Sequence, residues 1–132
     1  RGETNMLLGM GSFWEGVDFA QQDRVIEVIA RLPFDNPKDP FYQKLESWFS
    51  KQGKHTFNSY SLPMTILRFK QAIGRSQRRP DQRSAILLLD NRPLVKSYGK
   101  LFLKEVSQEI SLERTKFNTF NEEIQTFLQK ES

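Results

Sequence analysis

Hydrophobic residues recur at helical spacing between residues 62 and 79, the segment LPMTILRFKQAIGRSQRR. At about 100° per residue, four apolar side chains fall within about 60° of one another: Leu62, Ile66, Phe69 and Ile73. The opposite side carries polar or small residues at spacings i, i+3, i+4 and i+7: Gln71, Gly74, Arg75 and Arg78. The pattern predicts one helix over residues 62–79, which packs its apolar stripe on a sheet and projects two guanidinium groups from the other face.

Strand patterns alternate with further helical patterns along the chain. Strands are predicted over residues 6–10, 24–32 and 84–90, which are apolar or rich in β-branched residues. Helices are predicted from Pro40, with Asp39 as N-cap, to about Gln52, over residues 94–106, and over the amphipathic residues 111–130. This order predicts an α/β fold with a mostly parallel sheet flanked by helices. We expect residues 1–106 to form the domain and residues 107–132 to carry a helix packed on it.

Composition narrows the class of protein. The formal charge of the 132 residues is only +4, but residues 68–83 hold six basic residues and one acid, which suits a polyanionic ligand. The chain has no cysteine, which excludes disulfides and thiolate metal sites within it. No apolar run is long enough to cross a membrane, and the first residues match neither a signal nor a transit peptide, so we expect a cytoplasmic protein.

The residues at positions 71–78 suggest phosphate chemistry. A guanidinium group makes bidentate contacts with phosphate, and Arg75 and Arg78 are three residues apart on the predicted helix. Gly74 lies between them, where alanine would favour the helix by about 1 kcal/mol, and a glycine there allows close approach to the backbone. Periodicity alone is equally compatible with a solvated basic face.

The order of residues resembles that of a known family. Gln71 to Arg78 has the form Q-x-x-G-R-x-x-R and resembles motif VI of superfamily-two helicases, and residues 11–18, GSFWEGVD, resemble motif V of the DinG-like, XPD-related helicases. The sequences LPF at 32–34 and LLLDNR at 87–92 match what that family carries around these motifs. The resemblance covers residues 5–106 and implies the C-terminal part of such a helicase, a partial RecA-like domain.

This resemblance assigns roles at the ATP site. Arg75 and Arg78 would contact the γ-phosphate and Gln71 would orient water or phosphate, while ATP and Mg²⁺ would be bound mainly by an upstream helicase domain. Four further residues would face the nucleotide: Gly74, Glu15, Gly16 and Asp18. No G-x-x-x-x-G-K-[ST] loop occurs in the 132 residues, so we expect this segment alone to be inactive.

The resemblance also implies a path for single-stranded DNA. Ser12, Phe13, Trp14 and Arg92 would contact the strand, with the two aromatic rings available for base stacking. By their residue types alone, Phe13 and Trp14 also suit a core, Asp18 suits a turn or helix cap, and Arg92 suits a surface ion pair.

Three alternatives remain at this stage. A non-enzymatic nucleic-acid-binding module could use the basic residues 68–83, and an interaction domain could use the apolar stripe of residues 111–130, which includes Phe120. The segment could also belong to a protein whose upstream exonuclease domain provides the main activity. An exposed sheet edge could allow the segment to associate with itself.

Overall fold

A computed structural model of the chain describes residue 21, residues 23–115 and residues 119–129. The elements in order are β1 (Arg24–Ile29), α2 (Pro40–Lys51), the π-helix η1 (Phe57–Ser61), α3 (Leu62–Ser76), β2 (Arg83–Leu88), α4 (Arg92–Val95), α5 (Gly99–Val106) and α6 (Phe120–Gln129). None of the helices in these residues has the length and apolar character needed to span a bilayer. The strand predicted over residues 6–10 lies outside the described residues.

The two strands form a parallel pair. Their register runs from Arg24 opposite Arg83 to Ile29 opposite Leu88, and the crossover between them contains α2, η1 and α3. This arrangement confirms the predicted α/β class and is consistent with part of a RecA-like domain. Within the described residues β2 pairs with β1 alone.

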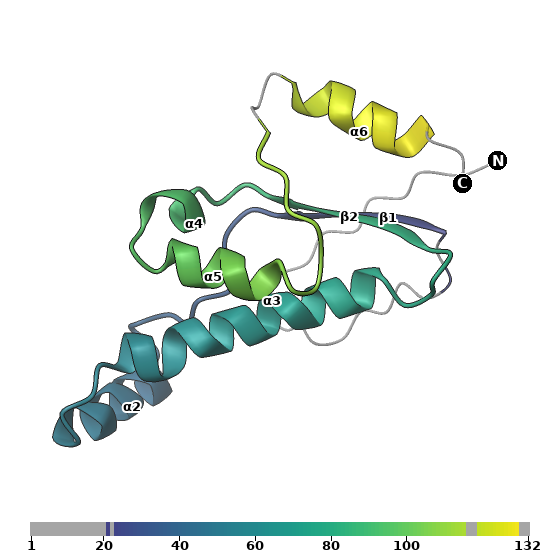
Figure 1. The fold of residues 1–132 in the computed structure, drawn as a ribbon. Coiled ribbons are helices and arrows are strands. Elements are labelled where there is room, and N and C mark those ends of the chain that lie inside the picture. The colour runs from purple at the N-terminus through teal and green to yellow at the C-terminus, as the bar shows by residue number, and fades with distance from the viewer. Residues whose placement is uncertain (1–20, 22, 116–118, 130–132) are drawn as a thin grey trace.

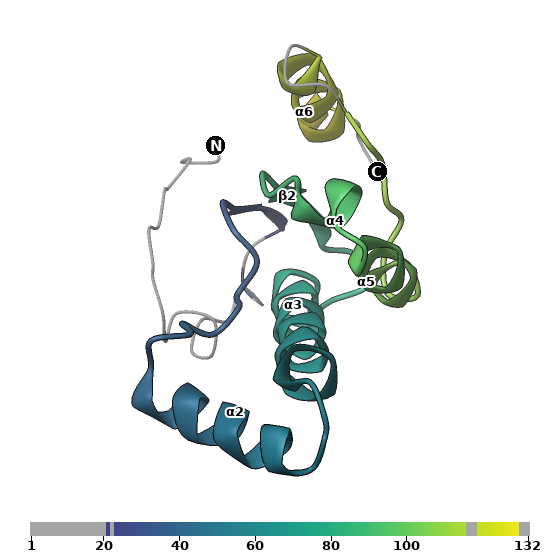
Figure 2. The same cartoon turned by 90° about the vertical axis from the view of Figure 1, so that its left-hand side faces the viewer.

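One face of the sheet is covered by α3 and α5 (Figures 1 and 2). The predicted stripe of α3 is buried, and it packs with residues from β1, the loop after β1 and α5: Ile29, Leu32, Phe102 and Val106. The rings of Phe69 and Phe102 meet edge to face, with centroids 5.3 Å apart. The hydrophobic pattern of residues 62–73 therefore gave the correct inward face of the helix.

Helix α2 begins where the sequence predicts. The Asp39 carboxylate accepts hydrogen bonds from the backbone N–H groups of Phe41 and Tyr42, and Gly53 follows the helix with a φ of 69°. None of the twelve residues of α2 is buried. Figures 1 and 2 show this helix beyond the amino end of α3, away from the sheet.

The predicted end of the α3 helix was wrong by three residues. Gln77 N–H still bonds to the Ile73 carbonyl, but Arg78 N–H donates instead to Oε1 of Gln82, at 2.6 Å. The α conformation is also disfavoured before Pro80. Arg78 therefore lies in the loop after α3, so it does not share a helical face with Arg75.

Other predicted boundaries also change. Strand β1 ends at Ile29 because Leu32 N–H bonds to the Asp90 carboxylate at 2.9 Å, outside the strand ladder. The helix predicted over 94–106 is two helices, and α5 starts so close to α4 that a Cβ on Gly99 would lie 1.9 Å from the Pro93 carbonyl oxygen.

The C-terminal helix starts later than predicted. Residues 111–115 are not helical, and α6 begins at Phe120. Serine, threonine and asparagine are frequent before that point and favour competing local hydrogen bonds, as between Thr115 and Thr119. Figures 1 and 2 show α6 on the side of the sheet opposite α3. The division of the chain at residue 106 stays a prediction.

Candidate functional site

The predicted site residues fall at two opposite ends of the sheet. Arg75 and Arg78 lie at the end of α3, near the amino ends of both strands, because Arg79 bonds to Asp23, just before β1. Arg92 follows the carboxyl end of β2. Six residues of strand separate the two ends by about 20 Å. A single small ligand therefore does not bridge Arg75 and Arg92 within this chain.

The last turns of α3 present the predicted polar face. Gln71 and Gly74 are exposed and Arg75 is half-buried, opposite the buried stripe. Apart from the backbone of its own helix, a Cβ built on Gly74 would meet no atom of the described residues within 4 Å, so packing among these residues does not require glycine there. This open backbone beside a guanidinium group leaves room for a ligand to approach.

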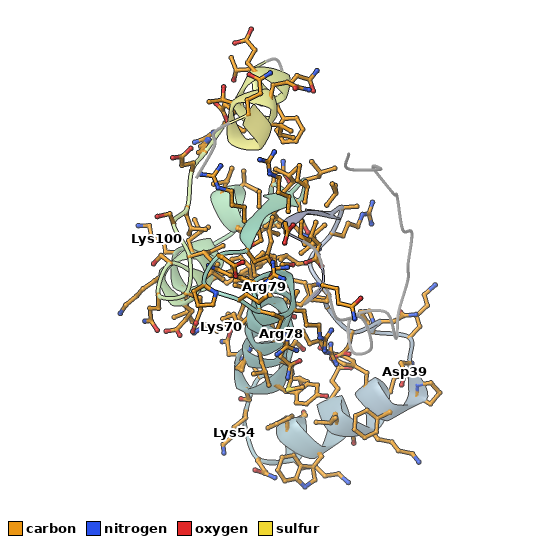
Figure 3. The ribbon with its side chains drawn as sticks, turned by 90° about the vertical axis from the view of Figure 1, so that its right-hand side faces the viewer. Asp39, Lys54, Lys70, Arg78, Arg79 and Lys100 are labelled. Atoms are coloured by element: carbon orange, nitrogen blue, oxygen red, sulfur yellow. The ribbon has the colours of Figure 1, made fainter. Side chains whose placement is uncertain are left out.

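Arg78 lies in a tight loop next to this face. Residues 79–82 form a turn in which Gln82 N–H bonds to the Arg79 carbonyl at 3.2 Å, with proline at the second position. Gln82 is 4% exposed, and its side chain holds the Arg78 backbone. The loop geometry, not helical spacing, therefore sets where Arg78 projects (Figure 3).

Two tertiary contacts fix the end of α3. Ser76, which is fully buried, donates a hydrogen bond to Oε2 of Glu27 in the middle of β1. Arg79 forms ion pairs with Asp23 and Asp81, and the hydrogen bond to Asp23 is the main reason its pKa is raised. Sequence reasoning did not identify Asp23, Glu27 or Ser76, because each pair joins residues about 50 positions apart that no local pattern connects.

Most of the basic cluster at residues 68–83 is already paired. Arg68 contacts Asp35 at 2.8 Å, and Lys70 lies 3.4 Å from Glu105. Arg78 and Arg83 also have interactions. Arg75 differs from these basic residues, because it forms no hydrogen bond through its side chain and no ion pair with any residue that the structure describes.

At the other end of the sheet, Arg92 is held by an acid. Its guanidinium binds the Asp90 carboxylate through Nε at 2.9 Å and through Nη2, and it lies over the Phe34 ring, 5.1 Å from the centroid. Asp90 is almost fully buried, which by itself raises its pKa. Hydrogen bonds from Arg92 and from the Leu32 N–H outweigh burial and lower the pKa of Asp90 to about 2.

A shallow pocket of about 380 Å³ lies at the carboxyl ends of the strands and is lined by residues 30–31 and 89–92.

The remaining residues that the sequence predicted at the nucleotide and DNA sites lie outside the described residues: Ser12, Phe13, Trp14, Glu15, Gly16 and Asp18. Residues 23–115 and 119–129 contain no cluster of three or more histidine, cysteine or acidic residues suited to a metal ion.

Comparison with known proteins identifies the family. The model of the helicase C-terminal domain matches residues 1–109. The chain is 41% identical over 98 residues to the 3'-5' exonuclease DinG of Bacillus subtilis, which is 74% of this chain and 10% of that protein. It is 37% identical over 109 residues to the 3'-5' exonuclease DinG of Staphylococcus saprophyticus, covering 83% of this chain and 11% of that protein.

A third relative carries a helicase name. The ATP-dependent DNA helicase YoaA of Escherichia coli is 34% identical over 98 residues, which is 74% of this chain and 15% of that protein. The chain thus spans only about a tenth to a seventh of the length of these three relatives. Because the family model matches most of the chain, the chain belongs to the helicase C-terminal domain family, together with the DinG and YoaA proteins.

Proposed function

We propose that this chain is the part of a DinG-type DNA helicase that completes an ATP site from across a cleft. ATP and Mg²⁺ are held mainly by an upstream domain of the same polypeptide. Arg75 and Arg78 of this chain contact the γ-phosphate, and Gln71 orients water or the phosphate. The segment alone supplies one wall of the site and is therefore inactive.

The observation that carries this proposal is the state of Arg75. It has no partner among the described residues, and it lies beside the open backbone of Gly74. An unpaired guanidinium group next to exposed helix backbone suits an incoming phosphate. Arginines supplied in this way stabilise the charge that develops during phosphoryl transfer and typically increase the rate by about 10³–10⁵.

The same residues link ATP to movement. When bound, ATP supplies the phosphate charge that draws Arg75 and Arg78 toward the upstream domain. The attraction weakens after hydrolysis, so the two domains separate and their contacts with single-stranded DNA alternate. Ser12, Phe13, Trp14 and Arg92 serve the DNA path in this proposal, and Glu15, Gly16 and Asp18 connect it to the nucleotide.

Rates of ATP hydrolysis by the complete protein, with and without single-stranded DNA, test the proposal. We expect DNA to stimulate the parent, and Arg75→Ala and Arg78→Ala each to lower the stimulated rate at least about a hundredfold while ATP still binds. Arg68→Ala is the matched control, because this arginine lies on the same helix but is paired with Asp35. An inactive parent, or unchanged rates in both variants, would contradict the proposal.

The names of two relatives support a second candidate function. The DinG proteins of Bacillus subtilis and Staphylococcus saprophyticus are named 3'-5' exonucleases. In this second candidate function, an exonuclease domain upstream of this chain provides the main activity. Nuclease assays of the complete protein distinguish the two: an exonuclease that does not need ATP and is unaffected by Arg75→Ala favours this second function.

A simple basic-patch module has less support. Arg68, Lys70 and Arg79 are neutralised by acids of the chain, so the basic cluster offers less free charge than its composition suggests.

A further inference from the structure

Helix α2 exposes large aromatic rings on one of its faces. Phe41 is 64% exposed, and Trp48, which follows it by seven residues on the same well-capped helix, is 55% exposed. Figure 3 shows this helix as an outer element of the molecule, with Asp39 at its start and Lys54 just after its end. The Trp48 ring meets the neighbouring Phe49 ring edge to face, with centroids 4.8 Å apart, yet Phe41 and Trp48 each keep more than half of their surface exposed.

The orientation of α2 is fixed from its other side. The hydroxyl groups of Tyr42 and Ser61 are hydrogen-bonded at 2.7 Å, which ties α2 to the residue just before α3. At about 100° per residue, Tyr42 is about 120° from Trp48 around the helix, whereas Phe41 is only about 20° from it. Phe41 and Trp48 therefore share a face that is turned away from this anchor.

Positive charge accompanies the rings. Lys44 and Lys51 lie about 40° and 60° from Trp48 around the helix, and both are exposed. The acid Glu46 lies about 160° away, and neither lysine forms an ion pair with a described residue. The face thus combines two exposed rings with two free ammonium groups.

We propose that this face of α2 binds single-stranded nucleic acid, with bases stacked on Phe41 and Trp48 and phosphates bound by Lys44 and Lys51. Stacking platforms combined with positive charge are how proteins hold single strands without sequence preference. The rings are about 10 Å apart along the helix, so each can hold a separate base. A protein partner fits less well, because the cores of protein interfaces are depleted of lysine.

This inference rests on the proposed function and adds a DNA contact to it at a separate place. Helix α2 leads through η1 into the amino end of α3, whereas Arg75 lies near the other end of that fifteen-residue helix. Changes on α2 should therefore affect DNA affinity and leave DNA-independent ATP hydrolysis unchanged.

Binding of a fluorescein-labelled oligo(dT) to the complete protein, measured by fluorescence anisotropy, tests the inference. We expect Trp48→Ala and Phe41→Ala each to weaken binding at least about fivefold, and Trp48→Phe to retain most of the affinity. The double variant Lys44→Gln/Lys51→Gln keeps the rings. It should reduce the slope of log K against log salt concentration by about 1.4, since each phosphate contact on a single strand contributes about 0.7.

Gln43→Ala is the matched control, because Gln43 is an exposed residue of α2 about 140° from Trp48. Unchanged oligo(dT) affinity and salt slope in both the Trp48 and the lysine variants would overturn the inference, as would a change in oligomeric state instead of DNA affinity. ATP hydrolysis by the same samples separates the two proposals. A parent that DNA does not stimulate contradicts the proposed function, whereas a stimulated parent with normal α2 variants contradicts only the inference.

Discussion

Arg79 donates a hydrogen bond from Nη2 to Oδ1 of Asp23, a residue 56 positions earlier in the chain. The backbone adds a second link, because Arg83 N–H bonds to the Asp23 carbonyl at 2.9 Å. Asp23 therefore holds both ends of the segment from Arg79 to Arg83, just after the loop residue Arg78. This clamp connects the end of α3 to the start of the sheet.

We expect Arg79→Ala to lower DNA-stimulated ATP hydrolysis far less than Arg75→Ala, because the Arg79 guanidinium is already paired. Asp23→Asn should have a similarly small effect, because it changes only the partner of Arg79 and keeps the backbone bond between Arg83 and Asp23. Both are measured beside Arg75→Ala in the ATP hydrolysis assay of the complete protein. If Arg79→Ala equals Arg75→Ala in its loss, then Arg79 itself contacts the phosphate and its pairing with Asp23 is not retained in the working protein.

Gly74→Ala separates packing from ligand approach. A Cβ at this position meets open space among the described residues, and alanine favours a helix interior by about 1 kcal/mol over glycine, so we expect unchanged or higher stability. We expect ATP hydrolysis to fall nevertheless, because the methyl group would occupy the space that a phosphate approaches. Urea denaturation and the ATP hydrolysis rate are the two measurements. A stable variant with the parent's rate would show that nothing approaches this backbone closely.

Asp90 gives the chain a pH-dependent contribution to stability. The pKa of Asp90 is about 2 in the folded chain, below its ordinary value of 3.8. As the pH falls, the Asp90 carboxylate is therefore protonated in the unfolded state before it is protonated in the folded state. The stabilisation is therefore present above about pH 4 and is lost between about pH 4 and 2, in total about 2 kcal/mol. Urea denaturation of the parent and of Asp90→Asn at several pH values measures the difference. Parallel curves for the two across that range would contradict this role.

Ser76→Ala should destabilise the chain by about 1–3 kcal/mol. The serine is fully buried, and its loss removes the hydrogen bond to the Glu27 carboxylate under the end of α3. Ser107→Ala is the control, because that hydroxyl is exposed and bonds to the nearby Lys104 carbonyl, so we expect a small effect. Equal free energies of unfolding for the two variants would show that the Ser76 contact contributes little.

The elements that depend on near neighbours were predictable from the sequence. The stripe of Leu62, Ile66, Phe69 and Ile73 gave the buried face of α3, and Asp39 followed by Pro40 gave the start of α2. Both signals act within one or two helical turns, where spacing and capping groups lie in the sequence itself. The motif order also gave the family, which the match of the helicase C-terminal domain model confirms.

The ends of elements were less predictable because longer-range contacts decide them. The side chain of Gln82 accepts a hydrogen bond from the Arg78 N–H where α3 ends. The Asp90 carboxylate accepts one from the Leu32 N–H where the chain leaves β1. Helical spacing alone had placed Arg75 and Arg78 on one face. The loop after α3 now sets the position of Arg78.

The sequence by itself determined the α/β class, the inward face of α3 and the opposite, polar face with Gln71, Gly74 and Arg75, because these follow from local periodicity. Only the tertiary structure decided which charges are available. Asp35, Glu105 and Asp23 reach Arg68, Lys70 and Arg79 from positions about 33 to 56 residues away, and Arg92 lies over the ring of Phe34, 58 residues earlier. Residues so far apart meet only when the parallel strands and the helices on them are packed, so composition counts such charges without showing that they are already paired.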